Sequence, residues 1–304
     1  MAKSYEISIV RKVLRGSHIK GAHRLIKWSG GVRRGALSGL GCLLNFDLSQ
    51  ANELYSYFFM GDDQYIRFWK GTVESGDAFI DVGANVGYYA CHLSKMVASS
   101  GLVLAFEPNP ATRQRLQENL DLNDSTNVLL LDYAVGECAR TDVLLASSEH
   151  GLSRLRNIRG DNFGIGTVDV EHTVRVVGID ELASRLSQHR VRGMKIDIEG
   201  CELSALRGAV GLIRTHHPVI QLEVNLNLMR QFGFYFRDLH AFFADLDYVT
   251  FAPEVPTGFV WSKSAVTLKA LGTGDDAPVR PADILACHRS DADFVLHKWR
   301  NRLQ

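Results

Sequence analysis

Between residues 77 and 140 the chain alternates short apolar runs with stretches of helical spacing. "DAFIDVG", "GLVLAFEP" and "NVLLLDYAV" are apolar runs of strand length. After the first run, Val86, Ala90, Leu93 and Val97 recur at helical spacing. After the second, "NPATRQRLQENL" opens with an asparagine suited to an N-cap and a proline suited to the first helical position. This alternation predicts a parallel sheet with right-handed crossovers.

The rhythm changes between about residues 141 and 180 and then resumes. "TDVLLAS" and "HTVRVVGI" predict antiparallel strands, and the segment between them is rich in glycine and arginine. Further on, "GMKIDIEG", "HPVIQLEVN", "YVTFAP" and "ADILACH" predict strands. "CELSALRGAVGLI" and "RDLHAFFADL" predict helices, the first with Leu203, Leu206, Val210 and Ile213 on one stripe. We therefore expect an α/β, doubly wound domain over residues 77–304 with a small β insertion at 141–180.

Residues 1–76 differ from the rest of the chain. Residues 1–34 carry nine lysines or arginines and one acid, Glu6, which predicts a solvated helix face or a mobile arm, or else a contact with an anionic partner or membrane. An aromatic stretch follows, and we expect the region to form a helical extension that caps the domain. Core packing is the favoured role of its aromatic side chains, and a lid over a ligand is the alternative. They are Tyr57, Phe58, Phe59, Tyr65, Phe68 and Trp69.

The composition is that of a globular protein without a strong preference for nucleic acid. The 304 residues have a formal net charge of zero and are 46% apolar. The five cysteines are scattered and never form C-x-x-C, which predicts reduced thiols and a cytoplasmic location. The apolar stretch "ALSGLGCLLNF" is too short to span a bilayer, and the opening residues have no signal-peptide pattern. We expect neither membrane insertion nor a nucleic-acid partner, and a homo-oligomer stays open.

The loop after the first strand reads G-A-N-V-G. A dinucleotide loop has glycine where this chain has Asn85, because the backbone must approach a pyrophosphate there. The larger side chain favours a ligand without a diphosphate, such as S-adenosylmethionine. Glu107 ends the second strand, where a carboxylate can accept both ribose hydroxyls. Asp132 ends the third strand, within reach of an adenine amino group, and Asp81 ends the first, where it could face the ligand's ammonium group.

Three segments together resemble the FkbM family of methyltransferases: "FIDVGANVGYYACHLSK", "VLAFEPNPATRQRLQENLDLN" and "MKIDIEGCELSALRGA", with "PVIQLEV" after them. The resemblance covers about residues 72–252. It implies a class I S-adenosylmethionine-dependent fold, with seven strands of which the last is antiparallel, and methyl transfer to oxygen on sugars or natural products. The cofactor contacts that it implies are Asp81, Gly83, Asn85, Gly87, Glu107 and Asp132. Their neighbours Ala84, Pro108, Asn109, Tyr133 and Ala134 are further candidates.

Two central strands carry polar residues on one face. Lys195, Asp197 and Glu199 share a face of "MKIDIEG", whereas Gln221, Glu223 and Asn225 share a face of "VIQLEVN". Central parallel strands are normally apolar on both faces, so the pattern predicts a buried polar cluster beside the cofactor. Buried charges must be paired, and Lys195 is expected to neutralise one carboxylate.

For catalysis, Asp197 is the first candidate for the base or orienting group, with Glu199 and Glu223 as rivals. A structural ion-pair network is the alternative to a catalytic one. No group has convincing metal-ligand spacing, so no metal is expected, although Asp197, Glu199 and Glu223 leave a weak magnesium site open.

Substrate contacts are expected in the insertion and next to the polar cluster. The candidates are His150, Ser153, Arg154 and Asn225. Arg154, Arg156 and Arg159 could hold an anionic acceptor such as a phosphorylated or uronic sugar, and a solvated loop is the alternative. The predicted function is an S-adenosylmethionine-dependent O-methyltransferase that acts on a hydroxyl of a sugar, glycolipid or natural product. The alternatives are an NAD-dependent oxidoreductase and a non-catalytic cofactor-binding protein of the same fold.

Overall fold

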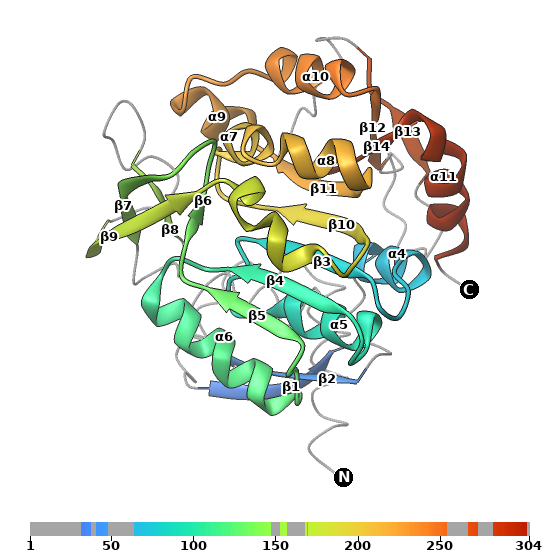
Figure 1. The fold of residues 1–304 in the computed structure, drawn as a ribbon. Coiled ribbons are helices and arrows are strands. Elements are labelled where there is room, and N and C mark those ends of the chain that lie inside the picture. The colour runs from blue at the N-terminus through green and yellow to red at the C-terminus, as the bar shows by residue number, and fades with distance from the viewer. Residues whose placement is uncertain are drawn as a thin grey trace, which may run out of the picture.

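The computed structural model describes residues 32–37, 41–47, 64–146, 153–156, 168, 170–253, 267–272 and 282–302. Its main sheet has eight strands in the order β13-β12-β14-β11-β10-β3-β4-β5 (Figure 1). These strands are β3 (Ala78–Val82), β4 (Leu102–Phe106), β5 (Val128–Leu131), β10 (Val191–Ile196), β11 (Val219–Val224), β12 (Tyr248–Pro253), β13 (Leu268–Ala270) and β14 (Ala282–His288).

Five neighbouring strands of this sheet are parallel to one another: β5, β4, β3, β10 and β11. Strand β14 runs antiparallel between β11 and β12. The predicted doubly wound sheet with a reversed last strand is therefore confirmed. The short strand β13 adds an eighth member, antiparallel to β12, at the edge of the sheet.

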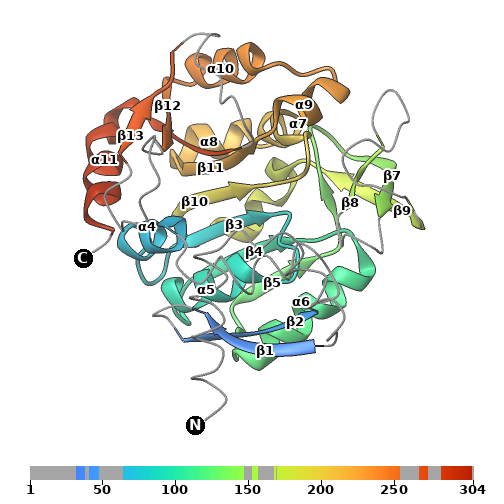
Figure 2. The ribbon, with the colours of Figure 1, turned by 180° about the vertical axis from the view of Figure 1, so that it is seen from behind.

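Helices cover both faces of the sheet, as Figures 1 and 2 show from opposite sides. Alternate strand residues point to opposite faces, so Phe79 packs in one core and Ile80 in the other. The core with Phe79 receives side chains from α4 (Gln64–Thr72), α5 (Tyr88–Val97), α6 (Pro110–Leu122) and α11 (Ala292–Asn301). The core with Ile80 receives them from α7 (Glu202–Arg207), α8 (Val210–His216), α9 (Leu226–Gln231), α10 (Phe236–Asp245) and the 3-10 helix η2 (Ile179–Leu186). A second 3-10 helix, η3 (Arg289–Asp291), precedes α11.

The insertion expected at residues 141–180 belongs to a separate four-stranded sheet in the order β6-β9-β7-β8, which also includes β6 from before that range. Its strands are β6 (Ala134–Val135), β7 (Arg140–Ala146), β8 (Ser153–Leu155) and β9 (Val170–Val177). The predicted antiparallel pair is β7 with β9, and β8 pairs with the free side of β7. In Figures 1 and 2 this sheet lies beyond the carboxyl ends of the central parallel strands. Ligands of open α/β sheets bind at that edge.

The opening segment differs from the expected helical extension. Helix α4 is present, but β1 (Val32–Leu37) and β2 (Cys42–Asp47) form an antiparallel hairpin. Cys42, Leu44 and Phe46 alternate with more exposed residues and are fully buried in the core beside α5 and α6. A period of two is typical of a strand that packs one face on a core, which explains why this segment is not helical. The basic residues before position 32 and Tyr57, Phe58 and Phe59 lie outside the described residues.

The predicted helix over residues 201–213 is broken into α7 and α8. The break lies at Gly208, where an added Cβ would sit 2.1 Å from the Gly136 carbonyl oxygen. The backbone of the insertion approaches too closely there for any side chain. The break also rotates the second half, so that Leu212 and not Val210 is buried beside Ile213.

Among the described residues, no helix is both long enough and apolar enough to cross a membrane.

Candidate functional site

The loop between β3 and α5 has three residues in the left-handed region: Gly83, Asn85 and Gly87, with φ of 78°, 50° and 92°. Asn85 tolerates this conformation better than most residues, and its Oδ1 accepts a hydrogen bond from the Val86 N–H at 2.8 Å. At Gly83 an added Cβ would lie 2.0 Å from the Asp197 carbonyl oxygen. The loop is therefore pressed against the residue that follows β10, which brings the predicted cofactor loop and the predicted base together.

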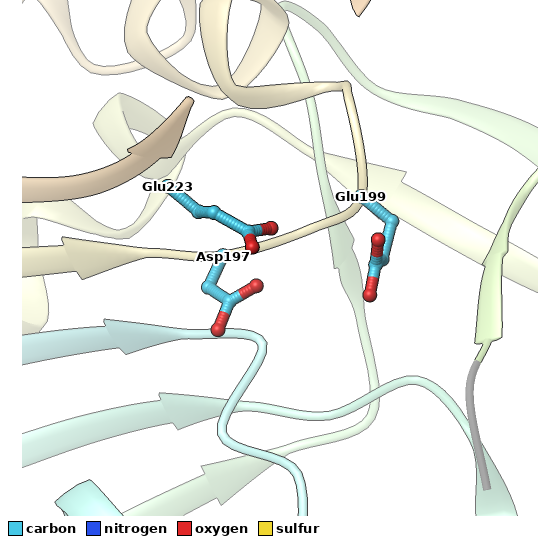
Figure 3. A group of neighbouring side chains, drawn as sticks. All are labelled: Asp197, Glu199 and Glu223. Carbon is cyan, nitrogen blue, oxygen red and sulfur yellow. The ribbon is translucent and has the colours of Figure 1, made fainter. Parts of the chain in front are cut away.

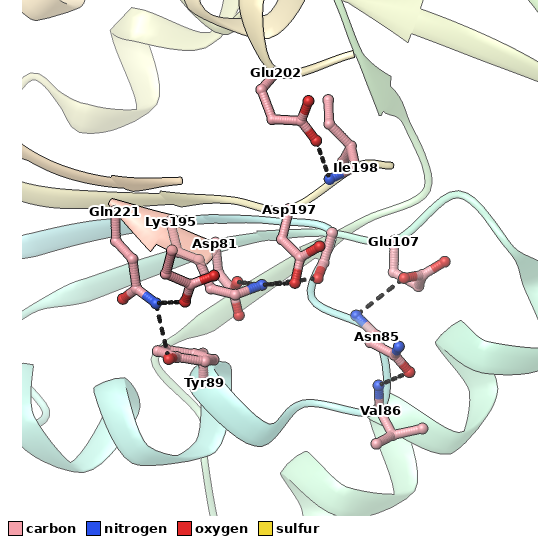
Figure 4. A network of polar contacts seen from close by, with 12 residues as sticks. Asp81, Asn85, Val86, Tyr89, Glu107, Lys195, Asp197, Ile198, Glu202 and Gln221 are labelled. Atoms are coloured by element: carbon pink, nitrogen blue, oxygen red, sulfur yellow. Dashed lines mark hydrogen bonds and ion pairs between the residues drawn. The ribbon is translucent and has the colours of Figure 1, made fainter. Parts of the chain in front are cut away.

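Glu107 lies directly after β4 and is buried. Its Oε2 accepts a hydrogen bond from Asn85 N–H at 3.0 Å (Figure 4). Its Oε1 accepts one from Asn109 N–H at 2.9 Å. Burial raises its pKa to about 7, and these backbone donors partly offset that effect. Each carboxylate oxygen has a second lone pair, so the side chain ties the glycine loop to the β4–α6 loop and can still accept hydrogen bonds from a ligand.

The remaining cofactor candidates follow the neighbouring strands. Asp132 is exposed after β5, and the Tyr133 ring lies 5.2 Å from the Arg175 guanidinium. Ala134 begins β6, so it belongs to the insertion sheet. Ala84 N–H donates to the Phe106 carbonyl. Pro108 and Asn109 form the entry to α6, where Asn109 Oδ1 caps the helix by accepting from Ala111 N–H at 3.0 Å. These groups share one edge, because β3, β4 and β5 are adjacent.

A polar cluster lies on the face of the sheet that α4 and α5 cover. Lys195 pairs in register with Asp81 on β3 and Gln221 on β11. Its Nζ lies 3.2 Å from Asp197 Oδ2 and 3.9 Å from Asp81 Oδ1, and it donates to the Gly83 carbonyl at 3.4 Å. The expectation that Lys195 pairs with a carboxylate is confirmed. Burial raises the Asp81 pKa to about 6, while the Lys195 charge acts to lower it.

Gln221 joins three elements around this cluster. Its Oε1 accepts from Trp69 Nε1 at 2.7 Å, and its Nε2 donates to the Tyr89 hydroxyl at 2.9 Å and to Asp283 Oδ2 at 2.7 Å. Lys195 Nζ lies 5.0 Å from the centre of the Tyr89 ring. Sequence reasoning placed Gln221 on the polar face but missed Tyr89 and Asp283, whose only signal is a polar group within an apolar segment.

Three carboxylates converge where β10 and β11 end (Figure 3). Asp197, Glu199 and Glu223 each offer an oxygen within 4.8 Å of the others. Burial and the Asp197 charge raise the Glu199 pKa to about 8 and the Glu223 pKa to about 9. Burial and the neighbouring charges therefore favour the protonated forms of Glu199 and Glu223. Oxygen ligands at this spacing are also what Mg²⁺ uses.

Glu202 holds the turn that carries this acidic group. Its Oε1 accepts from the N–H groups of Ile198 at 3.2 Å and Gly200 at 3.0 Å. Glu199, between them, adopts a left-handed φ of 57°. Sequence reasoning missed Glu202, although its place at the start of a helix after a glycine is typical of a carboxylate that accepts backbone N–H groups.

The substrate candidates are less concentrated. Arg154 on β8 is buried, and its Nη1 donates to Gln231 Oε1 at 2.6 Å. Ser153 is half-buried on the same strand. Asn225 caps α9 by accepting from Leu228 N–H at 3.4 Å. His150 and Arg159 lie outside the described residues, and Arg156 forms an exposed ion pair with Glu171.

Comparison with known proteins agrees with this geometry. The model of the methyltransferase FkbM domain matches residues 81–250. Hexuronic acid methyltransferase AglP of Haloferax volcanii is 28% identical over 160 residues, which cover 53% of this chain and 61% of that protein. Methyltransferase 1 of Beauveria bassiana is 27% identical over 150 residues, or 43% of this chain and 58% of that protein. The chain thus spans about three fifths of the length of these curated relatives.

The crystal structure of methyltransferase FkbM from Methylobacillus flagellatus KT aligns with 72% of this chain and 48% of its own, at 18% identity and a TM-score of 0.42. The strand order, with one reversed strand beside the parallel set, defines a class I methyltransferase fold. Because the family model covers more than half of the chain, the protein belongs to the FkbM methyltransferase family.

Proposed function

We propose that the protein is an S-adenosylmethionine-dependent O-methyltransferase whose acceptor is a sugar hydroxyl. The observation that carries the proposal is the position of Glu107. It is a buried carboxylate at the end of the second parallel strand, and it is bonded to the backbone of the glycine loop. A carboxylate at this point of an open α/β sheet can bind both ribose hydroxyls of a nucleoside.

The residues around Glu107 fit S-adenosylmethionine better than NAD. Asn85 occupies the position where a diphosphate requires glycine, and its side chain is fixed on Val86 N–H. Glu107 would hold the ribose, Asp132 the adenine amino group, and the loop from Gly83 to Gly87 the amino-acid part. When bound, S-adenosylmethionine supplies a methyl group that is already activated by its sulfonium.

The acceptor hydroxyl then needs alignment and a proton acceptor. Asp197 is the proposed base. Lys195 Nζ lies 3.2 Å from an Asp197 carboxylate oxygen. The backbone of Asp197 lies close to the cofactor loop at Gly83. The raised pKa values of Glu199 and Glu223, about 8 and 9, favour their protonated forms at neutral pH. They suit hydrogen-bond donation to a sugar oxygen better than proton removal.

The name of one relative and the charge of one insertion residue support this acceptor class. One relative is named as a hexuronic acid methyltransferase, and buried Arg154 lies in the insertion beyond the strand ends. A hexuronic acid residue is therefore the first acceptor to test. Neutral sugars, glycolipids and hydroxylated natural products follow.

Calorimetric titration with S-adenosylmethionine, S-adenosylhomocysteine and NAD tests the cofactor. Micromolar binding of both sulfur ligands with no heat from NAD is expected, whereas binding of NAD alone would favour an oxidoreductase. A methyl-transfer assay over the acceptor panel follows, with and without EDTA. Transfer to a hydroxyl that survives EDTA is expected. Loss restored by Mg²⁺ would assign the three carboxylates to a cation, and cofactor binding without any transfer would favour the non-catalytic alternative.

A further inference from the structure

Two asparagines, Asn119 on α6 and Asn123 at the C-cap of α6, hold the outer edge of the N-terminal hairpin. Asn123 Oδ1 accepts from Leu43 N–H at 2.9 Å, and its Nδ2 donates to the Leu43 carbonyl at 2.6 Å. Asn119 Oδ1 accepts from Asn45 N–H at 2.8 Å, and its Nδ2 lies 3.5 Å from the Asn45 carbonyl. Each side-chain amide thus takes the place that a neighbouring strand would have.

The spacing of the two elements makes this arrangement possible. Residues two apart on a strand are separated by about 6.8 Å, and residues four apart on a helix by about 6 Å. Leu43 and Asn45 therefore face Asn119 and Asn123 in opposite order along the two chains. An edge strand otherwise presents unpaired N–H and C=O groups. Hydrogen bonds from the hairpin backbone to these two side chains fix the hairpin to α6, in addition to its buried face of Cys42, Leu44 and Phe46.

Asn119 also reaches the glycine loop, which Asn123 does not among the contacts of the described residues. Asn119 Nδ2 donates to the Val86 carbonyl at 2.8 Å, and the side chain is fully buried. Val86 lies between Asn85 and Gly87, two of the three left-handed residues of the loop. The same helix closes on Gly87, where an added Cβ would lie 2.3 Å from Leu116 Cδ1. One amide therefore connects β2, α6 and the loop that Glu107 holds from the other side.

We infer that Asn119 is a positioning residue for the cofactor loop, held in orientation by the backbone of the hairpin at Asn45. The inference rests on the proposed function for its link to the cofactor. The hairpin thereby supports the cofactor site through Asn119, although the candidate cofactor residues themselves lie at or just after the ends of main-sheet strands. Because the Asn119 amide is anchored at its oxygen by Asn45, its nitrogen is directed at Val86 without a rotamer search on binding.

The test compares Asn119→Asp with its matched control Asn123→Asp. Each change keeps the shape of the side chain and its acceptor oxygen, and replaces the amide NH₂ by a second carboxylate oxygen. The two positions are four residues apart in sequence. In Asn119→Asp an oxygen replaces Nδ2 opposite the Val86 carbonyl, so the loop loses this hydrogen bond while the carboxylate is ionised. S-adenosylhomocysteine affinity is expected to fall at least tenfold in Asn119→Asp and less than threefold in Asn123→Asp, measured by calorimetry.

Hydrogen exchange of the ligand-free proteins gives a second measurement that does not depend on the cofactor. Amides of residues 83–89 are expected to exchange faster in Asn119→Asp, and only those of residues 42–47 in Asn123→Asp. Unchanged exchange and affinity in Asn119→Asp would overturn the inference, as would equal losses in both variants. If the wild type itself does not bind the ligand, the proposed function fails and exchange alone decides the role of Asn119. Should Asn119→Asp not fold, Asn119→Ser replaces it with the same expectation.

Discussion

Lys195 places its ammonium nitrogen 3.2 Å from a carboxylate oxygen of Asp197, the proposed base, on the side opposite Asp81. Asp81 is fully buried and has no nearer cation among the described residues. One lysine therefore balances an inaccessible carboxylate of β3 and orients a half-exposed one after β10. Removing a partner from a buried ion pair costs about 3–5 kcal/mol when the other charge stays. Here Asp81 can take up a proton instead, since its pKa is already about 6.

Lys195→Met is expected to lower kcat by about a hundredfold, the lower range for loss of acid–base assistance. Asp197 then loses the cation that orients it, while the cofactor contacts of Glu107 stay in place. Methyl transfer at saturating cofactor measures the effect, and calorimetry should show cofactor affinity changed by less than about fivefold. Lys70→Met, at an exposed position of α4, is the control. A normal kcat in Lys195→Met would remove the polar cluster from catalysis and leave it as a structural network.

Glu107→Gln is expected to weaken S-adenosylhomocysteine binding by about ten- to a hundredfold. Both carboxylate oxygens accept backbone N–H groups, so the new amide NH₂ must face either Asn85 N–H or Asn109 N–H. A repelled donor costs about 1–3 kcal/mol at a buried site, and the ribose loses an acceptor. Calorimetry gives the affinity. Glu118→Gln on the exposed face of α6 should bind normally, and equal affinities in the two variants would contradict the assignment of Glu107.

The sequence is most informative where a local pattern and the fold agree. Apolar runs bounded by Gly83 and Glu107 predict the strands, and the strand ends place the acids at one edge whatever the details of packing. The alternation in "MKIDIEG" also predicts correctly that Lys195 lies in a polar cluster. The pairing of Lys195 with Asp81 leaves no local trace in the sequence, because the register between β10 and β3 joins residues more than a hundred positions apart.

The N-terminal hairpin shows the opposite case. Three alternating apolar residues of β2 carry a strand signal that is short beside the basic and aromatic residues around it. The hydrogen bonds that fix the hairpin come from Asn119 and Asn123, which on the sequence are ordinary polar positions of an exposed-looking helix. Likewise, Trp69 has the pattern of a core residue and is one, yet its indole N–H also orients Gln221. Side-chain hydrogen bonds between distant elements produce no periodic pattern in the sequence, so these roles could not be predicted from it.

Stability should fall with rising pH, and Glu223→Gln should reduce that fall. The folded-state pKa of Glu223 is raised to about 9 from an ordinary value of 4.5. Above pH 4.5 the unfolded chain loses this proton while the folded protein keeps it, so the contribution is complete at low pH and is lost as pH rises toward 9. Glutamine stays neutral throughout. Between pH 5 and pH 9 the variant is expected to lose less unfolding free energy than the wild type, by about 1 kcal/mol or more.

Urea unfolding at pH 5, 7 and 9 measures this difference. Glu118→Gln controls for the loss of one acid from the whole chain, and its pH dependence should match that of the wild type. Parallel curves for Glu223→Gln and the wild type would show that the acidic group ionises freely in the folded protein. The crowding of Asp197, Glu199 and Glu223 would then have no energetic consequence.

Gly83→Ala is expected to damage both stability and turnover, and Gly41→Ala provides a control matched in backbone conformation. Both glycines have a left-handed φ, 78° and 67°, so alanine costs about 1–2 kcal/mol at either position. Around Gly41 an added Cβ meets nothing within 4 Å, whereas at Gly83 it would lie 2.0 Å from the Asp197 carbonyl oxygen. Because backbone and not a flexible side chain is in the way, the strand end that carries Asp197 must move.

The difference between the two variants therefore isolates the contact from the backbone strain. Gly83→Ala should lose at least about 2 kcal/mol more unfolding free energy than Gly41→Ala, as overpacking of a close contact does. Its kcat should fall by at least tenfold under conditions where the protein stays folded, while Gly41→Ala keeps normal turnover. Equal stabilities would mean that the loop and β10 separate easily. In that case the approach of Gly83 to Asp197 would not be what aligns the proposed base with the cofactor loop.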